Sequence, residues 1–280
     1  MSAKSGMKAK PMFAEALRHA LILFVLLFAF LPLYMMLQIS LKDNAQFTNN
    51  LWFPAAPFHW ENWLVGWLAI RDFIANTVVV AVFSTVLTLA FATITAYVFA
   101  RYKFFGSEFI FFLLLGVLMM VGVAELVPLF TLLRDMQLLN TLSALVILSV
   151  AGGQAMCVYV LKNFIEDIPK DLFDAAAIDG AGDFGSIWNV VLPMSGAILS
   201  TLGILRFIAT WNDFIMPMLI MRDQKLYTIG VGLMSLSSGY DRLWGPLMAA
   251  YCIASIPLIL IFVFTMRLFV KGLSSGAVKG

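Results

Sequence analysis

The sequence is poor in the side chains from which catalytic and metal sites are built. Its 280 residues include two histidines and two cysteines, and only 12% are charged. No His, Cys or carboxylate cluster has the spacing of a metal site or of a catalytic centre. Cys157 and Cys252 fall within apolar runs, where a thiol behaves as a small hydrophobic side chain. We therefore expect no catalytic residue and no metal ligand, which disfavours a membrane-bound enzyme.

Two further absences narrow the choice of partners. The pattern Gly-x-x-x-x-Gly-Lys-Ser/Thr, which binds nucleotide phosphates, does not occur, so no cofactor is expected in this chain and any ATP must be hydrolysed elsewhere. The formal net charge is only +2, and the basic residues form no stripe. Nucleic acid is therefore not an expected partner.

Hydrophobic residues are what the sequence has in excess. They make up 62% of the chain, and the mean hydropathy is +0.94, which no ordinary water-soluble surface can accommodate. A membrane-spanning helix needs about 20 mostly apolar residues. Six stretches qualify, at 21–41, 73–100, 109–133, 141–161, 194–220 and 244–268. We predict an all-α membrane protein with six transmembrane helices in a lipid bilayer.

Lysine and arginine are unevenly divided between the two sides of these stretches. One side holds Lys4, Lys8, Lys10, Arg18, Arg101, Lys103, Lys162, Lys170, Arg267, Lys271 and Lys279, whereas the other holds Lys42, Arg71, Arg134, Arg222, Lys225 and Arg242. Because cytoplasmic segments carry more Lys and Arg, both termini should be cytoplasmic. This divides the chain into an N-terminus (1–20), a transmembrane domain (21–272) with a cytoplasmic loop at 162–193, and a tail (273–280).

The loop at 162–193 has the signals of a folded segment. Pro169 suits the start of a helix, Asp171 and Asp174 complement the positive end of its dipole, and Gly180 can end it. The pattern predicts a helix of about three turns. A second apolar rhythm follows, made by Phe184, Ile187, Trp188 and Val191. We expect an amphipathic pair that presents small residues outward, where another protein could approach closely.

The same loop carries a family resemblance. Residues 174–193 read DAAAIDGAGDFGSIWNVVLP, which closely resembles the EAA loop of binding-protein-dependent ABC importer permeases, although Asp174 stands where that family has Glu. Other stretches resemble the carbohydrate-uptake group, which includes the second membrane subunit of the maltose transporter. These stretches are 96–102 (AYVFARY), 139–141 (LNT), 163–164 with 168–169, 211–214 (WNDF) and the tail at 272–280.

This resemblance implies a MetI-like ABC importer permease fold in a bacterial inner membrane. It also implies several partners: a second, homologous permease subunit, two ABC ATPase subunits that bind ATP-Mg, an extracytoplasmic solute-binding protein and a carbohydrate solute such as a sugar, an oligosaccharide or a polyol. The positions that match the family's ATPase-coupling residues are Asp174, Ala175, Ala176, Asp179, Gly180 and Ala181. The alternative for this loop is an ordinary capped helix at the membrane surface.

Charges within the apolar stretches are the remaining candidates. A charge near the bilayer centre costs several kcal/mol and should face the interior of the helix bundle. Glu125 and Arg206 are expected at similar depth, where they could pair with each other, or Arg206 could face the translocation path. Trp211, Asn212 and Asp213 follow at the outer half of the fifth stretch and suit either solute recognition or contact with the partner permease.

A secondary transporter driven by an ion gradient is the rival hypothesis. Such proteins often contain inverted repeats with broken helices in matching positions. The sequence shows no convincing pair of halves, and the 162–193 loop would have no role in that mechanism. An ATP-driven permease is therefore favoured.

Overall fold

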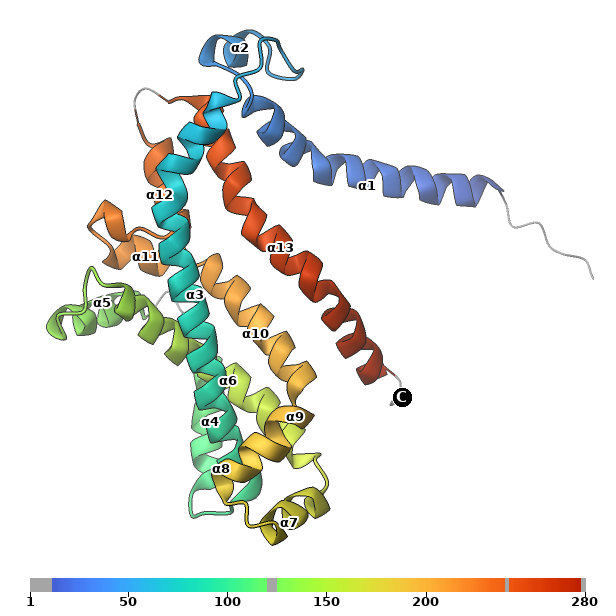
Figure 1. Ribbon diagram of the computed structural model, residues 1–280, viewed down its shortest axis with the longest axis vertical. Helices are drawn as coiled ribbons and strands as arrows, with labels where there is room; N and C mark the ends of the chain where they lie inside the picture. Colours follow the sequence, from blue (N-terminus) through green and yellow to red (C-terminus); the bar gives the residue numbers. More distant parts are fainter. Residues whose placement is uncertain (1–11, 120–124, 240–241, 278–280) are drawn as a thin grey trace, which may run out of the picture. The chain divides into compact units, whose positions relative to one another are not determined.

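The computed structural model describes residues 12–119, 125–239 and 242–277, and the described chain is helical without strands (Figure 1). This confirms the all-α prediction. Two compact units are present: residues 1–69 with 239–253, and residues 70–238 with 254–280. The long helices α3 (Glu61–Arg101) and α13 (Trp244–Ala277) contribute to both units.

The first unit contains α1 (Met12–Ile39), the short α2 (Asn44–Asn49) and the beginnings of α3 and α13. Asp43 caps α2 through a reciprocal capping box with Gln46, which satisfies two backbone N–H groups at once. The buried Asn62 of α3 donates to the carbonyls of Ser40 and Lys42 at 3.0 and 2.9 Å. These bonds fix the segment between α1 and α2 onto α3.

The second unit contains the rest of α3 and α13 and all the helices between them. These are α4 (Ser107–Val117), α5 (Leu126–Asp135), α6 (Leu142–Glu166), α7 (Lys170–Ile178), α8 (Asp183–Ser186), the π-helical η1 (Ile187–Val191), α9 (Leu192–Met194), α10 (Gly196–Trp211), α11 (Ile215–Ile220), the 3₁₀ turn η2 (Gln224–Leu226) and α12 (Ile229–Ser237). Their largest core cluster combines residues of α3, α6, α7, η1 and α10, including Ala96, Val158, Phe173, Val191 and Leu202.

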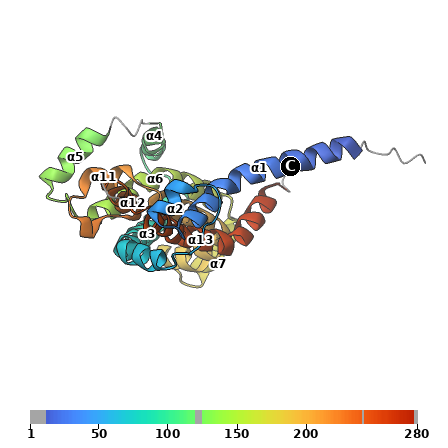
Figure 2. The ribbon, with the colours of Figure 1, turned by 90° about the horizontal axis from the view of Figure 1, so that it is seen from above.

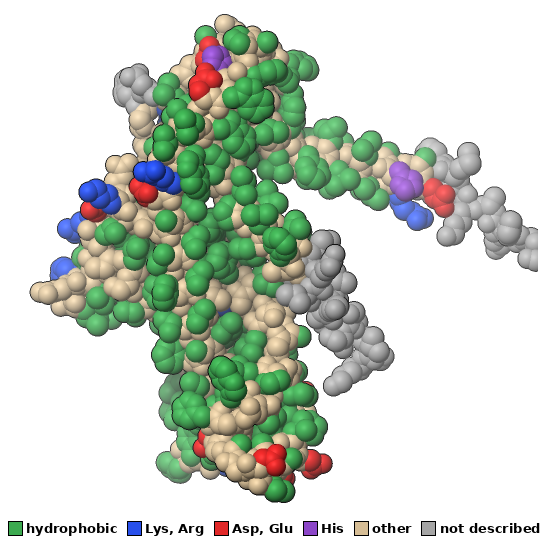
Figure 3. All heavy atoms as spheres, viewed as in Figure 1, with side chains coloured by type: hydrophobic (Ala, Val, Ile, Leu, Met, Phe, Trp, Pro, Cys, Tyr) green, Lys and Arg blue, Asp and Glu red, His purple; other side chains and the backbone are tan. Residues whose placement is uncertain are grey.

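Many apolar side chains of the helices are exposed, as expected for a surface that faces lipid. Hydrophobic side chains cover much of the face seen in Figure 3, and exposed examples on α3 include Phe83, Val86 and Phe91. Within the described residues, four helices are long and apolar enough to cross a membrane: α1 from Glu15, α3, α6 and α13. A bent pair, Asp183–Met194 with Gly196–Trp211, makes a fifth candidate.

Two of the six predicted spans are not continuous helices. Within 109–133 the described residues form the separate helices α4 and α5, which point in different directions in Figures 1 and 2, and residues 120–124 lie outside the described part. Within 194–220, α10 ends at Trp211 and α11 begins at Ile215. In both cases a proline, Pro128 or Pro217, lies in the first turn of the second helix, where it lacks the N–H that would continue the preceding helix.

Candidate functional site

Helix α7 lies in the predicted coupling loop and ends in a well-defined turn. Gly180 has φ +81°, and its N–H donates to the carbonyl of Ala177 at 3.0 Å, while the N–H of Ala181 donates to that of Ala176 at 2.9 Å. This pair of bonds is the Schellman motif, which satisfies the last carbonyls of a helix. The predicted helix and its glycine stop are therefore present, with Pro169 as the N-cap residue.

The C-terminal end of α3 holds this loop from two sides. The Phe173 ring is buried, with the Arg101 guanidinium carbon 3.9 Å from its centroid. The Asp183 carboxylate accepts hydrogen bonds from the Tyr97 hydroxyl at 3.1 Å and the Tyr102 hydroxyl at 2.5 Å. The hydrogen bond to Asp183 raises the pKa of Tyr102, because it stabilises the protonated phenol. We call these five residues the clamp.

The outer face of the loop is more apolar than the sequence predicts. Small residues are exposed as expected, including Ala175 and Gly180, and the carboxylates of Asp174 and Asp179 are exposed with them, while Ala176 and Ala181 are partly buried. However, three large side chains are also exposed: Ile178 (86%), Phe184 (79%) and Trp188 (73%). We call these three residues the apolar patch. The outward face therefore includes the expected small residues and, in addition, the apolar patch.

The second half of the loop has the predicted helical rhythm, but only part of its apolar side is buried. Val191 is buried and Ile187 is partly buried, whereas Phe184 and Trp188 point to solvent. The spacing of these four residues places them on one apolar face of a helix, so it carries no signal that Phe184 and Trp188 would be exposed.

A π-helical turn interrupts this segment just before Pro193. Residues 187–191 form η1, and the helical arm from Asp183 to Met194 meets α10 at a bend of 81°. Proline has no N–H to donate to the carbonyl of residue 189, so the regular α-helical bond pattern fails at this point. The bend separates the arm that carries Phe184 and Trp188 from α10, which carries Arg206.

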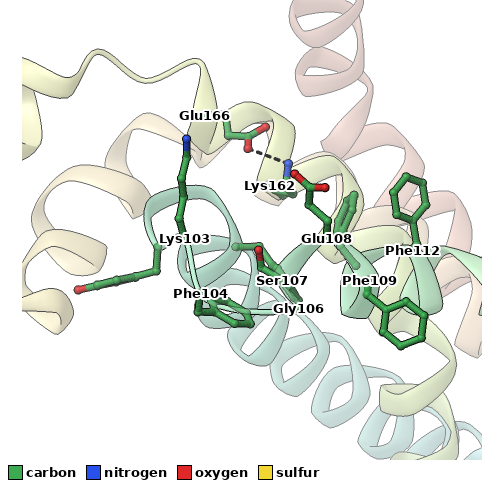
Figure 4. Close-up of a pocket in the computed structure, with 12 residues that line it drawn as sticks. Lys103, Phe104, Gly106, Ser107, Glu108, Phe109, Phe112, Lys162 and Glu166 are labelled. Carbon is green, nitrogen blue, oxygen red and sulfur yellow. Dashed lines mark hydrogen bonds and ion pairs between the residues drawn. The ribbon is translucent and has the colours of Figure 1, made fainter.

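A cavity of about 610 Å³ lies where the 102–108 turn faces the end of α6 (Figure 4). Lys162 and Glu166 form an ion pair at 2.7 Å, and the Lys162 ammonium is 4.8 Å from the centroid of the Phe111 ring. Lys103 and Glu108 also line this cavity. The basic charges here are therefore partly neutralised.

A second cavity, of about 410 Å³, brings together the three predicted intramembrane charges. Glu125, Arg206 and Asp213 all line it, with Ser149 and Thr210 among their neighbours. The hydroxyls of Ser149 and Thr210 are 2.7 Å apart. Sequence reasoning missed these two residues because hydroxyls are common within transmembrane helices and carry no distinctive spacing.

Arg206 binds α6 and forms no ion pair with Glu125. Its Nη2 donates to the Ser149 carbonyl at 2.8 Å and to the Ser149 hydroxyl at 3.1 Å. No ion pair within 4.0 Å joins Arg206 to a carboxylate in the described part of the chain. The hypothesis of a direct Arg206–Glu125 pair therefore has no support in this geometry.

Trp211 and Asn212, the other two solute-path candidates, do not line this cavity. Trp211 is buried and stacks on Phe207 with the ring centroids 5.7 Å apart. Asn212 is exposed and donates to the Ile208 carbonyl at 2.9 Å. Both side chains have local roles at the end of α10.

The family of the chain follows from comparison with known proteins. Residues 79–275 match the model of the binding-protein-dependent transport system inner membrane component. The matched segment contains the loop, the clamp and the cavity described above. The chain belongs to this family of ABC importer permeases, and it is a multi-pass component of the inner membrane.

Individual relatives cover most of the chain. It is 33% identical to the probable ABC transporter permease protein YurM of Bacillus subtilis, over 89% of this chain and 83% of the relative. It is 31% identical to the melibiose/raffinose/stachyose import permease protein MelC of the same species, over 90% and 92%. A bacterial ABC transporter that imports the acidic polysaccharide alginate has a chain with the same fold, at TM-score 0.79, 20% identity, and 94% and 99% coverage.

Proposed function

We propose that this chain is one of two membrane subunits of an ATP-driven importer for carbohydrates. Relatives with similar sequences are named as permeases for melibiose, raffinose and stachyose and for arabinooligosaccharides, and the family is named for its dependence on binding proteins. An extracytoplasmic binding protein delivers the solute. A second permease completes the membrane part, and two ATPase subunits supply the energy.

The observation that carries this proposal is the clamped loop with its apolar patch. Ile178, Phe184 and Trp188 are exposed on a segment that α3 holds in place. An exposed apolar patch on a rigid, charged loop marks a protein interface. The ATPase subunits are the partners that bind there, with Asp174, Ala175, Asp179 and Gly180 around the patch and Ala176 and Ala181 beneath it.

ATP-dependent uptake tests the proposal directly. The complete complex is reconstituted in proteoliposomes with its binding protein and supplied with raffinose, arabinotriose, diacetylchitobiose, trigalacturonate or an alginate trisaccharide. We expect uptake of at least one of these solutes only with ATP inside the vesicles. Uptake driven by a proton or sodium gradient without ATP would instead support a secondary transporter.

Topology is tested by cysteine labelling. Ala177→Cys in α7 and Ala45→Cys in α2 are both at exposed positions, whereas the native Cys157 and Cys252 are buried. The distribution of Lys and Arg predicts cytoplasmic termini, so an impermeant maleimide applied outside intact cells should label position 45 only. Labelling of position 177 from outside would reverse the orientation and remove the proposed ATPase contact.

A further inference from the structure

The cavity lined by Glu125, Arg206 and Asp213 holds three ionisable side chains in a unit built from membrane-spanning helices. Such side chains are expensive within a membrane and mark pathways or partners when they are present. A mutual ion pair would remove much of the cost, but Arg206 pairs with neither carboxylate. Their presence in this cavity therefore requires another explanation.

Arg206 is held in a fixed position beside the cavity. Its Nη2 is bound to Ser149, and a Cβ added at Gly153 would be only 2.6 Å from its Nε, so the guanidinium lies directly against the α6 backbone. Its Nη1 donates to no residue in the described part of the chain. The guanidinium is thus anchored at one end and has donor capacity left for a ligand.

The two carboxylates provide acceptors in the same cavity. Asp213 accepts a long hydrogen bond, 3.4 Å, from the N–H of Met216, and the Glu125 side chain caps no backbone N–H of α5. With one guanidinium and two carboxylates, the cavity has both donors and acceptors and a formal charge of −1 when all three are ionised. The Ser149 and Thr210 hydroxyls add groups that can either donate or accept a hydrogen bond.

We propose that this cavity is a solute-contact site in the translocation path and that it selects neutral, polyhydroxylated solutes over acidic ones. Sugar hydroxyls both donate and accept, so they match carboxylates and a guanidinium together. An anionic solute meets a cavity whose formal charge is −1, and the two carboxylates repel it. The volume of about 410 Å³ falls within the usual range for small-molecule sites.

The position of the cavity fits the proposed function, on which this inference rests. Ser149 is seven residues from the start of α6 at Leu142, about 10 Å along the helix axis. With both termini in the cytoplasm, that end of α6 faces outward. The cavity then lies in the outer half of the membrane, where a binding protein releases its solute.

The experiment compares neutral with acidic solutes in the reconstituted complex. Uptake is measured for raffinose, arabinotriose and diacetylchitobiose and for trigalacturonate and alginate trisaccharide. Uptake variants are wild type, Glu125→Gln, Asp213→Asn and the double variant of these two, with Glu166→Gln in the other cavity as the matched control. Arg206→Met, alone and combined with Glu125→Gln, is added for the stability measurement. Thermal unfolding of each complex is measured in parallel, because a structural role would change stability with uptake.

We expect the wild type to transport a neutral solute and no acidic one. Each single variant should lower the uptake of the neutral solute about tenfold, which is the usual effect of losing a charge-assisted hydrogen bond, while thermal unfolding and the control stay unchanged. Solute-independent ATP hydrolysis should also be unchanged.

Three outcomes would overturn this inference and leave the proposed function intact. The first is ATP-driven uptake of only an acidic solute by the wild type. The second is unchanged neutral-solute uptake in the double variant. The third is a loss of stability in Glu125→Gln and in Arg206→Met that is recovered when both are combined, because this would show a structural pair. Failure of ATP-driven uptake for every solute would instead refute the proposed function.

Discussion

The clamp and the cavity lined by Glu125, Arg206 and Asp213 use charged residues in opposite ways. In the clamp, Asp183 accepts two tyrosine hydroxyls and Arg101 lies over an aromatic ring. In the cavity, Glu125 and Arg206 line the same space, and no ion pair within 4.0 Å joins Arg206 to a carboxylate in the described part of the chain. Satisfied groups make a segment rigid, whereas unsatisfied ones remain free to bind a ligand. In the proposed function, the clamped loop transmits force and the cavity contacts solute.

Disrupting the turn at Gly180 should have the largest effect. A side chain with a Cβ costs about 1–2 kcal/mol in the left-handed region, and Gly180 has φ +81°. We expect Gly180→Val to reduce ATP-driven uptake roughly tenfold or more, since about 1.4 kcal/mol corresponds to a factor of ten. The loss of stability should not exceed this local backbone strain, because Gly180 is exposed and an added Cβ meets no atom within 4 Å.

Gly182→Val is the matched control for this prediction. Gly182 is also exposed with nothing within 4 Å of an added Cβ, but its φ of −75° is open to any residue. Its uptake should stay near that of the wild type. Equal losses in both variants would show that the loop tolerates no added bulk, and the turn geometry would then not be the cause.

The neighbouring glycines of α6 test how tightly the cavity wall is packed. An added Cβ at Gly153 would lie 2.6 Å from Arg206 Nε and 2.8 Å from Thr88 Cγ2, whereas at Gly152 it would meet nothing within 4 Å. Overpacking costs about 1–3 kcal/mol, while Gly→Ala within a helix gains up to about 1 kcal/mol. Gly153→Ala should therefore lower the temperature of unfolding, and Gly152→Ala should leave it unchanged or raise it.

The measurement is thermal unfolding of the purified complex, with uptake as a second readout. A Gly153→Ala complex as stable as Gly152→Ala would show that Arg206 does not lie against α6. The guanidinium would then be mobile, and its proposed fixed position at the cavity would be wrong.

The smallest effect is expected at the clamp. Asp183 has two tyrosine donors, so Tyr97→Phe or Tyr102→Phe alone leaves one hydrogen bond in place. Each should lower binding-protein-stimulated ATP hydrolysis only about twofold, and the double variant should lower it by more than the product of the two. Simple multiplication of the single effects would show that the tyrosines do not share Asp183 as a functional partner.

The local features of the loop could be predicted from the sequence, because they depend on residues close together in the chain. Pro169 and Gly180 determine where α7 begins and ends, whatever surrounds it. The clamp could not be predicted, since Tyr97 and Asp183 are 86 positions apart and meet only through the packing of α3 on the loop. Whether Phe184 and Trp188 are buried or exposed likewise depends on how distant segments pack around the loop.

The intramembrane charges show a similar division. That Glu125, Arg206 and Asp213 would gather follows from the cost of facing lipid with a charge. The hydrogen-bond partner of Arg206 could not be predicted. It is the backbone carbonyl and the hydroxyl of Ser149, and neither group has a recognisable sequence signal. The breaks near Pro128 and Pro217 could not be predicted from the apolar stretches alone, because prolines within transmembrane helices are often tolerated.

The 81° bend between the Asp183–Met194 arm and α10 gives the second unit the form of a crank. The arm has twelve residues and spans about 18 Å, while Arg206 lies ten residues beyond Gly196, about 15 Å from the elbow. For two rigid limbs of nearly equal length, a displacement of about 1 Å at the tip of one moves the other by about 0.8 Å. With these proportions the motion is passed on slightly reduced, so under the proposed function the size of the movement at the ATPase contact sets the size of the movement at Arg206.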